Sequence, residues 1–507
     1  MAELNPDESK KWSKDIFFIF ACVGAAVGVG NLWRFPYMAY ENGGGAFLFP
    51  YIICLLLVGI PITLLEIGMG RWGGGSVAQA FRKANSSWTW VGWWALVNSM
   101  VILFYYAVVL GWCAQYVVYS LTEAWGDDPA GFFLKHVVRL TGNPFEFGGI
   151  NYASIAALAI IWGSIFLIVR SGTKGLSRVL LVTVPLPALL LIILGGRSLS
   201  MPGSGQGISH FFTPQPNKIL NVSVWAAAAS QVVLSLSLGM GQIVAYASKK
   251  RDDKRIVKSG VTICFLDLAF SLLAGITVFA TMGFLAASKG VTLNDLKLDG
   301  IFLAFVSYPM AISSLPLAPL WGVLFFVLLV SLGIDSAFAA VEAVITGAED
   351  VAPYKKRNYL AALICTIGFI GGIFFTTGSG LLWLDIVDHW VAYYSIGAIV
   401  VLQCIVFGHF APLGEIASRI TQSWPRIFTV TWQKLISFVI PIILAGIFGL
   451  KIAGELSKRY SNYPLLALLL GGWGMLLLAA VVGILLGRWH NKVMTSREQN
   501  DHNGLGV

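Results

Sequence analysis

Long apolar runs alternate with short polar segments along most of this chain. Each run is close to 20 residues or longer, the length that an α-helix needs to cross the hydrocarbon core of a bilayer. The pattern predicts an all-α polytopic membrane protein with twelve transmembrane helices. Their expected bounds are 15–39, 43–70, 89–121, 150–170, 177–195, 222–248, 257–287, 318–348, 358–376, 381–408, 428–450 and 463–487.

Two of these spans are interrupted near their middles by glycines and small polar residues. The first contains GAAVGVGN, residues 24–31, and the sixth contains SLSLGMGQ, residues 235–242. Glycine weakens a helix by about 1 kcal/mol relative to alanine, and unwound backbone inside a membrane lines a cavity instead of facing lipid. Close helix packing through small residues is the alternative for either segment alone. Breaks five spans apart favour two halves of opposite topology.

This inverted repeat predicts a single transmembrane transporter domain. The expected domain covers residues 15–487, with repeats at about 15–195 and 222–408 and two extra helices within 428–487. A cytoplasmic N-terminal segment, 1–14, and a cytoplasmic tail, 488–507, would flank it. We find no pattern of a cleaved signal peptide at the start of the chain.

Composition and charge support a membrane location. Hydrophobic residues make up 57% of the 507 residues and charged residues 12%, whereas a soluble domain is about 25% charged. The net charge of +9 does not indicate nucleic acid, because the basic residues lie in short loops between apolar runs. Their uneven distribution predicts that both termini are cytoplasmic. Compact outer loops are typical of a bacterial protein, so we expect a multi-pass protein of the cell inner (plasma) membrane, with the lipid bilayer as its surroundings.

Few charged residues fall inside the predicted spans, and each is a functional candidate because charge is costly in lipid. They are Arg34, Glu66, Asp267, Asp335, Glu342, Asp385 and Asp388. Asp335 stands beside Ser336, and a carboxylate, a hydroxyl and backbone carbonyls suit a hard cation. Asp267, with Asn31 and Ser235 on the two broken helices, would form a second oxygen-rich group.

A structural role is the alternative for any one of these carboxylates. Glu66 fits it best, because Glu66 could accept hydrogen bonds from backbone N–H groups freed by a break. The six cysteines lack metal spacing, the six histidines are scattered, and no HExxH, GxSxG or Walker sequence occurs. The sequence therefore predicts a protein that is not an enzyme and has no organic cofactor.

The segment GAAVGVGNLWRFPYMAYENGGGAFLFPY, residues 24–51, resembles the signature of the neurotransmitter:sodium symporter family. QVVLSLSLGMG, SGVTICFLDLAFS, GIDSAFAAVEA and LDIVDHW follow in the family's order and spacing, so the resemblance covers essentially the whole chain. It implies the 5+5 inverted-repeat fold of the bacterial leucine transporter, with helices 1 and 6 unwound. It also implies sodium-coupled import of an L-amino acid by alternating access, with two Na⁺ ions, by a monomer or weak dimer.

The resemblance assigns ligands to two sodium sites. The first site would use the Ala26 carbonyl, Asn31, Ser235 and Asp267, together with the substrate carboxylate. The second site would use the carbonyls of Gly24, Val27 and Leu332 and the side chains of Asp335 and Ser336. These are the two oxygen-rich groups already indicated by the residues themselves.

The resemblance also assigns a substrate site. Its residues would be Ala26, Val29, Gly30, Ile102, Tyr106, Leu234, Ser235, Ser237, Met240, Ser336 and Ala340. The substrate carboxylate would meet the first sodium, the amides of Val29 and Gly30, and the Tyr106 hydroxyl.

The predicted pocket departs from the family pattern in ways that bear on the substrate. Gly28 stands where monoamine carriers have an aspartate, which favours a substrate with its own carboxylate. Leu234 and Met240 replace aromatic residues, and Ala340 replaces an isoleucine, so we expect a larger, adaptable cavity. A bulky apolar or aromatic L-amino acid follows, unless Ile102 or Phe338 fills the gap and the substrate is small.

The chloride position departs as well. Chloride-dependent relatives place a serine where Ser271 lies, alongside Tyr51, Gln231 and an asparagine, but the asparagine is Asp267 here. Two unit charges 4 Å apart repel by about 4 kcal/mol at an effective dielectric constant of 20. The sequence therefore predicts chloride-independent transport, and proton counter-transport through Asp267 is left open.

Two gates complete the resemblance. The outer gate would be Arg34 and Asp388, which would close on each other when substrate binds. The inner gate matches the family in Trp12 and Asp350. Ser9 falls where an arginine is expected, and Lys10 or Lys11 could substitute for it.

Two other functions remain open at this stage. A proton-coupled amino-acid carrier of the same fold typically has a lysine near the second cation site, where this chain has Asp335 and Ser336. A non-transporting amino-acid sensor would need a signalling domain, and the sequence predicts none.

Overall fold

The computed structural model describes residues 12, 14–250, 256–296, 300–420, 426–457 and 459–502. In these residues the only strand-like pairings are two isolated bridges, Gly44 with Pro214 and Ile150 with Thr377. The prediction of an all-α protein is confirmed.

The α-helices are α1 (Asp15–Ala26), α2 (Val29–Glu41), α3 (Gly45–Cys54), α4 (Ile60–Gly73), α5 (Val77–Ala84), α6 (Thr89–Ser120), α7 (Pro129–Gly131), α8 (Tyr152–Val169), α9 (Gly172–Thr183), α10 (Pro185–Leu199), α11 (Ser204–Phe212), α12 (Pro216–Ile219), α13 (Val222–Ser235), α14 (Gln242–Ser248), α15 (Ile256–Lys289), α16 (Gly300–Phe302), α17 (Tyr308–Ser313), α18 (Ala318–Val351), α19 (Arg357–Ile373), α20 (Gly380–Asp388), α21 (Ile396–His409), α22 (Leu413–Ile420), α23 (Arg426–Lys434), α24 (Ile440–Ser457), α25 (Leu465–Ala467) and α26 (Met475–His502).

Short segments of other helix types continue several of these helices or join them. The π-helical segments are η2 (Leu55–Gly59), η4 (Phe132–Val137), η6 (Leu303–Ser307), η8 (His389–Ser395), η9 (Leu435–Val439) and η11 (Leu468–Gly474). The 3₁₀ segments are η3 (Ser86–Trp88), η5 (Leu293–Asp295), η7 (Phe374–Thr376) and η10 (Tyr460–Asn462).

The described residues contain 10 helical spans that are long and apolar enough to cross a membrane. An eleventh arises if α1 and α2, which meet at a bend of 51°, count as one span. The predicted sixth span, 222–248, is divided between α13 and α14, neither of which is long enough alone. The twelve predicted spans thus match the 10 spans, the bent pair α1 and α2, and the divided segment α13 and α14. The assignment of residues 15–195 and 222–408 as inverted repeats stays a prediction.

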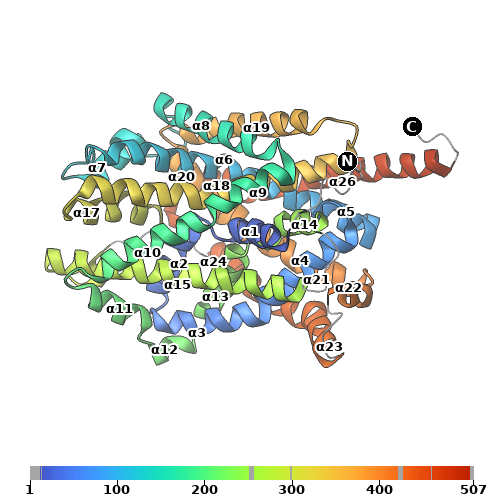
Figure 1. Cartoon of the computed structure of the whole chain (residues 1–507), viewed down its shortest axis with the longest axis horizontal. Helices are drawn as coiled ribbons and strands as arrows, with labels where there is room; N and C mark the ends of the chain where they lie inside the picture. The colour runs from blue at the N-terminus through green and yellow to red at the C-terminus, as the bar shows by residue number, and fades with distance from the viewer. Residues whose placement is uncertain are drawn as a thin grey trace.

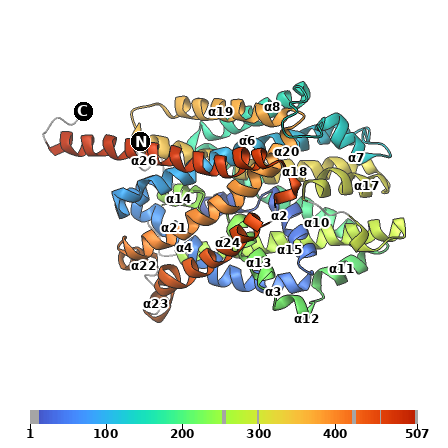
Figure 2. The same cartoon turned by 180° about the vertical axis from the view of Figure 1, so that it is seen from behind.

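The helices run side by side along the long axis of the molecule, with connecting segments at both ends (Figures 1 and 2). At one end lie α7, α11, α12 and α17. They belong to the connections 122–149, 196–221 and 288–317, which the distribution of basic residues predicts to face outside. At the opposite end lie α5, α22 and the C-terminal part of α26. We call these the outer end and the inner end, after the predicted orientation.

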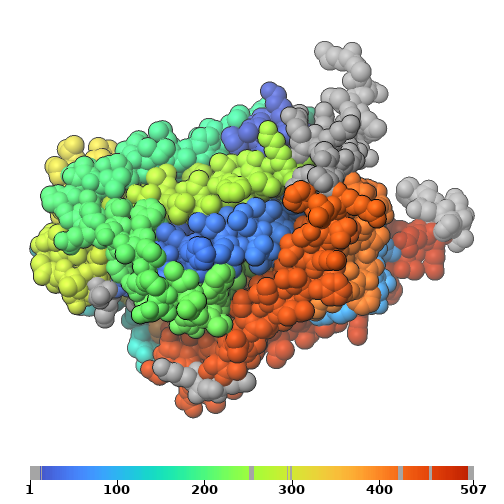
Figure 3. All heavy atoms as spheres, turned by 90° about the horizontal axis from the view of Figure 1, so that it is seen from below, coloured from blue at the N-terminus to red at the C-terminus, as the bar shows by residue number. Residues whose placement is uncertain are grey.

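The two broken helices lie in the middle of the bundle, and apolar side chains cover its outside. In Figure 1, α1, α2 and α14 are surrounded by longer helices such as α15 and α18. Figure 3 shows one outer face, where the segment from α3 to α4 lies between α15 and α24. On α24, Ile442 and Leu450 are 69% and 66% exposed. Large apolar side chains exposed over a whole face indicate a lipid-facing surface.

Candidate ion and substrate site

The first broken helix changes direction at Val27 and Gly28. α1 ends at Ala26 and α2 begins at Val29. Val27 (φ −80°, ψ 103°) and Gly28 (φ −126°, ψ −172°) are both extended, so the regular backbone hydrogen bonding of the helix stops here. The Gly28 amide donates a hydrogen bond of 2.9 Å to Asn31 Oδ1, which caps the start of α2.

The second broken helix is interrupted over residues 236–241. Ser237, Gly239 and Gly241 have φ angles of 52°, 75° and 78°. Glycine takes such angles without steric cost, whereas a serine in this region costs on the order of 1–3 kcal/mol. Ser237 Oγ donates to the carbonyl oxygen of Ala25 at 2.9 Å. The strained serine therefore ties the two breaks together.

Two neighbouring helices support the second break. The Gly239 amide donates to Glu66 Oε1 on α4 at 2.7 Å, as the sequence predicted for a carboxylate beside freed backbone. Gln403 Nε2 donates to the same Glu66 oxygen at 3.2 Å. On the other side, Ser99 Oγ on α6 donates to the Met240 carbonyl at 3.0 Å. The sequence did not indicate Gln403 or Ser99, because both lie far from the break along the chain.

The structure brings Asn31, Ser235 and Asp267 together from α2, α13 and α15. Asn31 Nδ2 lies 2.8 Å from Asp267 Oδ1 and 3.0 Å from Ser235 Oγ. Ser235 Oγ lies 2.8 and 2.9 Å from the two Asp267 oxygens. Asn31 Nδ2 also lies 2.9 Å from Ser271 Oγ. We call these four buried side chains the Asp267 cluster. Its oxygens all have hydrogen-bond partners without an ion.

Asp335 instead faces a small cavity. The cavity is lined by Val23, Gly24, Val27, Thr183, Val184, Pro187, Phe270, Leu332 and Asp335. Asp335 Oδ1 is buried, and within the described part of the chain it has no hydrogen-bond partner. We call this space the Asp335 cavity. An unpaired buried carboxylate oxygen is costly, so the cavity suits a hard cation.

The first broken helix approaches this cavity closely. A Cβ atom added to Gly24 would lie 3.0 Å from Asp335 Oδ2, so only glycine fits here without a shift. Ser336 Oγ donates to the Gly24 carbonyl at 3.1 Å. Four of the five predicted second-site residues thus line the cavity and the fifth contacts Gly24. The sequence missed Thr183, whose hydroxyl is the cavity's only other polar side chain among the described lining residues.

The predicted carboxylate position lies beside Gly28. A Cβ atom at Gly28 would lie 2.9 Å from Ser336 Oγ and 3.4 Å from Tyr106 Oη, whereas a Cβ atom at Gly30 would meet nothing within 4 Å. A side chain at residue 28 would therefore crowd the Tyr106 and Ser336 hydroxyls. Space remains beside Gly30.

The other predicted substrate residues come from helices that meet this point. Ile102 lies one turn from Tyr106 on α6, and Ala340 lies one turn from Ser336 on α18, so each pair shares a helix face. Ile102, Tyr106 and Leu234 are partly exposed. Gly30 and Ser336 are also partly exposed. The remaining six residues are buried: Ala26, Val29, Ser235, Ser237, Met240 and Ala340. Their roles in substrate binding stay predictions, as do those of the predicted sodium ligands.

Of the predicted chloride residues, Ser271 is part of the Asp267 cluster. Its Oγ accepts a hydrogen bond from Asn31. Tyr51 and Gln231 are also buried. The carboxylate that replaces the family's asparagine is therefore in the same cluster as the serine of the predicted chloride position.

The predicted gate residues have partners that the sequence did not indicate. At the outer gate, Asp388 Oδ1 accepts a hydrogen bond of 2.7 Å from Tyr105, and the Arg34 guanidinium lies 5.9 Å from the centre of the Tyr393 ring. Arg34 and Asp388 are each engaged with an aromatic residue. The arrangement fits an outer gate that is not closed by this pair.

At the inner gate, Trp12 is buried at 2% exposure, and its Nε1 donates to the Tyr246 carbonyl at 3.0 Å. Asp350 Oδ2 accepts from the Ser76 amide at 2.9 Å. Ser9, Lys10 and Lys11 lie outside the described residues.

The fold and these contacts define a class of protein: a polytopic membrane transporter in which two discontinuous helices cross around a buried, oxygen-rich centre. A family model described as the sodium:neurotransmitter symporter family matches residues 9–129 and 126–491. This chain therefore belongs to the sodium:neurotransmitter symporter family, whose members are transporters and not enzymes.

Individual relatives agree with this family. An uncharacterized sodium-dependent transporter of Methanocaldococcus jannaschii is 35% identical over 481 residues, which cover 94% of this chain and 97% of the relative. The sodium- and chloride-dependent glycine transporter 1 of Xenopus laevis is 30% identical over 496 residues, 86% of this chain and 78% of the relative. The sodium- and chloride-dependent creatine transporter 1 of Homo sapiens is 30% identical over 522 residues, 89% of this chain and 79% of the relative.

Proposed function

We propose that this chain couples sodium entry to the import of a bulky apolar or aromatic L-amino acid, by alternating access and without chloride. It would act in the cell inner membrane with both termini cytoplasmic. One observation carries the proposal. The Asp267 cluster and the Asp335 cavity both contain groups from the first broken helix, one on either side of its break. Ions bound to these groups would order the backbone that also binds substrate.

The second sodium would bind in the Asp335 cavity. Its ligands would be the carbonyls of Gly24, Val27 and Leu332 and the side chains of Asp335 and Ser336. The unpaired Asp335 Oδ1 supports this assignment, because a cation would supply its missing partner.

The first sodium would bind in the Asp267 cluster, with the Ala26 carbonyl as a further ligand. Asn31 Nδ2 now contacts Asp267 and Ser235. Because a cation needs oxygen ligands, the Asn31 amide would have to turn its Oδ1 toward the ion. The substrate carboxylate would complete this site, so sodium and substrate would bind here together.

The substrate carboxylate would lie beside Gly28, near the N-terminus of α2 and the Tyr106 hydroxyl. The N-terminus of a half-helix presents unpaired amides and a positive dipole end to an anion. The names of two relatives, for glycine and creatine, support this class of substrate, because both compounds carry a carboxylate. The Leu234, Met240 and Ala340 side chains favour a bulky substrate over these small ones.

Alternating access would then exchange the partners of the gate residues. Binding of sodium and substrate would draw Arg34 from Tyr393 and Asp388 from Tyr105 into an ion pair that closes the outer side. Release of the second sodium would open the inner side. The coupling follows because both ligands stabilise the same arrangement of one cavity.

Chloride would not be needed because Asp267 supplies the negative charge. Two relatives are named as chloride-dependent. Chloride independence of this chain would therefore rest on Asp267, which stands where chloride-dependent relatives have an asparagine. Equal uptake in chloride and in gluconate is expected. Strong stimulation by chloride would contradict it.

A thermal-shift assay on the purified protein tests the proposal, with each of the twenty amino acids in sodium and in potassium. A ligand that binds the folded state at 100 times its Kd stabilises it by about 2.7 kcal/mol. We expect an aromatic or large aliphatic amino acid to stabilise the protein only in sodium. Equal stabilisation in potassium would contradict sodium coupling and favour a proton-coupled carrier, and a clear preference for glycine would contradict the bulky substrate.

A further inference from the structure

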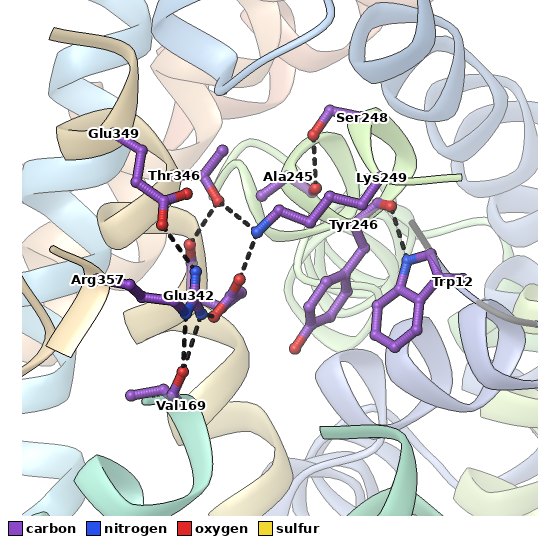
Figure 4. A network of polar contacts seen from close by, with 10 residues as sticks. All are labelled: Trp12, Val169, Ala245, Tyr246, Ser248, Lys249, Glu342, Thr346, Glu349 and Arg357. Atoms are coloured by element: carbon purple, nitrogen blue, oxygen red, sulfur yellow. Dashed lines mark hydrogen bonds and ion pairs between the residues drawn. The ribbon is translucent and has the colours of Figure 1, made fainter. Parts of the chain in front are cut away.

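A group of charged side chains is centred on one buried carboxylate (Figure 4). None of its members is a predicted sodium or substrate residue. Its centre is Glu342 on α18, whose side chain is 1% exposed. One carboxylate oxygen of Glu342 pairs with Lys249 Nζ, and the other pairs with Arg357 Nη2. Arg357 Nη1 also donates to Glu349 Oε1 at 2.9 Å. Two cations and two carboxylates thus form a balanced group.

Three of these four side chains belong to helices that pack on one another. Arg357 begins α19, while Glu342 and Glu349 lie on α18. Arg357 Nε and Nη2 also donate to the Val169 carbonyl at the end of α8, at 3.0 and 2.9 Å. Since α8, α18 and α19 contact each other, we expect Arg357 to stay beside Glu342 when the broken helices move.

Lys249 is the exception, because it follows the last residue of α14. This short helix is the second half of the second broken helix. Besides Glu342, Lys249 Nζ contacts Thr346 Oγ1 on α18 at 3.1 Å. The Lys249 side chain therefore connects a broken helix to α18 across the inner end (Figure 4).

This ion pair is suited to breaking and re-forming. Removing one partner of a buried pair is strongly destabilising when the other is left as an uncompensated charge. If α14 moved away, Glu342 would keep Arg357 as its counter-ion. Lys249, already 13% exposed, would enter water. The pair thus holds α14 in place without making its departure prohibitive.

The residues of α18 that Lys249 contacts, Glu342 and Thr346, lie between the Asp335 cavity and the inner end. Glu342 follows Asp335 by seven residues, which places it on the same helix face about 10 Å further toward the inner end. The amide of Trp12 donates to the Lys249 carbonyl at 3.0 Å, so Trp12 covers the same end of α14. A movement of α14 away from Glu342 would uncover this face of α18.

We propose that Lys249 is the cation of the inner gate in this protein. It holds α14 on Glu342 while the inner side is closed and leaves Glu342 to Arg357 when the inner side opens. This assignment deepens the alternating-access transport proposed above and rests on it. The family resemblance instead implied Asp350 as the acidic residue of the inner gate. In the structure Asp350 accepts a hydrogen bond from the Ser76 amide, and Lys249 pairs with Glu342.

Reaction of an introduced cysteine with a charged methanethiosulfonate reagent tests this proposal without any substrate. Val184 is buried and lines the Asp335 cavity, so Val184→Cys would report when water enters the cavity from the inner side. The six native cysteines are all buried and would be replaced in the background protein. Reaction rates would be measured in potassium on inside-out membrane vesicles, where the charged reagent reaches only the inner side of the protein.

Lys249→Met is expected to raise the reaction rate by about 10-fold, because loss of the ion pair favours the inner-open state. Lys249→Arg should restore a slow rate. The matched control is Lys250→Met. Lys250 pairs with Asp15 on α1 at 2.6 Å and so connects two broken-helix segments, not α14 to α18. This control should leave the rate unchanged.

An unchanged rate in Lys249→Met, or an equal increase in Lys250→Met, would overturn the proposal. If Lys249→Met does not fold, Lys249→Gln is measured against the same control and decides in the same way. Failure of every amino acid to bind would contradict the proposed substrate but would leave this labelling result standing. The two failures are therefore distinguishable.

Discussion

Asp267 and Asp335 are both buried carboxylates beside the break in the first helix, at 0% and 2% exposure, yet their surroundings differ. Asp267 is hydrogen-bonded by Asn31 and Ser235, while Asp335 faces a cavity and its Oδ1 has no hydrogen-bond partner among the described residues. The Asp267 cluster is complete without an ion, so a cation must displace existing hydrogen bonds there. The Asp335 cavity needs no such rearrangement. We therefore expect sodium alone to bind at Asp335, and sodium at Asp267 to require substrate.

Asp335→Asn gives the largest expected effect on this comparison. It keeps the size of the side chain but removes the charge that the bound cation needs. Apparent sodium affinity without amino acid should fall at least about 100-fold, which corresponds to about 2.7 kcal/mol. Thermal shift against sodium concentration measures it. The comparison fails if Asp335→Asn keeps the sodium-only shift while Asp267→Asn loses it.

Asp267→Asn is expected to make transport chloride-dependent. The asparagine would restore the residue that chloride-dependent relatives have, and removal of the carboxylate would end the repulsion of a chloride ion. Uptake by the variant should be about 10-fold higher in chloride than in gluconate. Asp385→Asn is the control, because Asp385 is hydrogen-bonded to Tyr460 and Tyr463 away from the cluster. Equal uptake of the Asp267 variant in both anions would disprove this role.

Gly28→Ala should weaken substrate binding more than sodium binding at Asp335, because Ser336 is only one of five proposed ligands of that sodium. The alanine Cβ would lie 2.9 Å from Ser336 Oγ, so the hydroxyls near the predicted carboxylate position must move. We expect a roughly 10-fold rise in the Kd for the amino acid, or about 1.4 kcal/mol. Gly30→Ala is the matched control, since its Cβ would meet nothing within 4 Å. Equal losses in both variants would show that the space beside Gly28 has no special role.

Glu66→Gln gives the smallest expected effect, because Glu66 supports the second break through the Gly239 amide and is not a predicted sodium ligand. The glutamine would still accept a hydrogen bond from the Gly239 amide but without charge assistance. A loss of about 1 kcal/mol in stability is expected, measured as a lower Tm. Glu415→Gln controls for surface charge, because the Glu415–Arg419 pair is 47% exposed on both sides. A Tm loss as large in the control would remove the support for this role of Glu66.

Local sequence patterns were sufficient to predict the apolar spans, both breaks and the meeting of Asn31, Ser235 and Asp267. Glycine clusters act on the residues around them, and a buried carboxylate must find donors, so Glu66 could be assigned to a break. The Tyr105 contact of Asp388 and the Ser99 contact of Met240 could not be predicted, because they depend on how helices distant in sequence rotate against each other. Lys249 belongs to a basic loop that indicated membrane orientation only, and its pairing with Glu342 depends on where α14 ends.

Uptake into proteoliposomes tests the central claim of sodium-coupled amino-acid transport most directly. Vesicles containing the purified protein would be given the amino acid that stabilises it best, with an inward sodium gradient or with potassium on both sides. The account predicts accumulation above the outside concentration only with the sodium gradient, equally in chloride and gluconate, and its loss in Asp335→Asn. Accumulation that is the same without sodium, or that follows an imposed proton gradient instead, would contradict it.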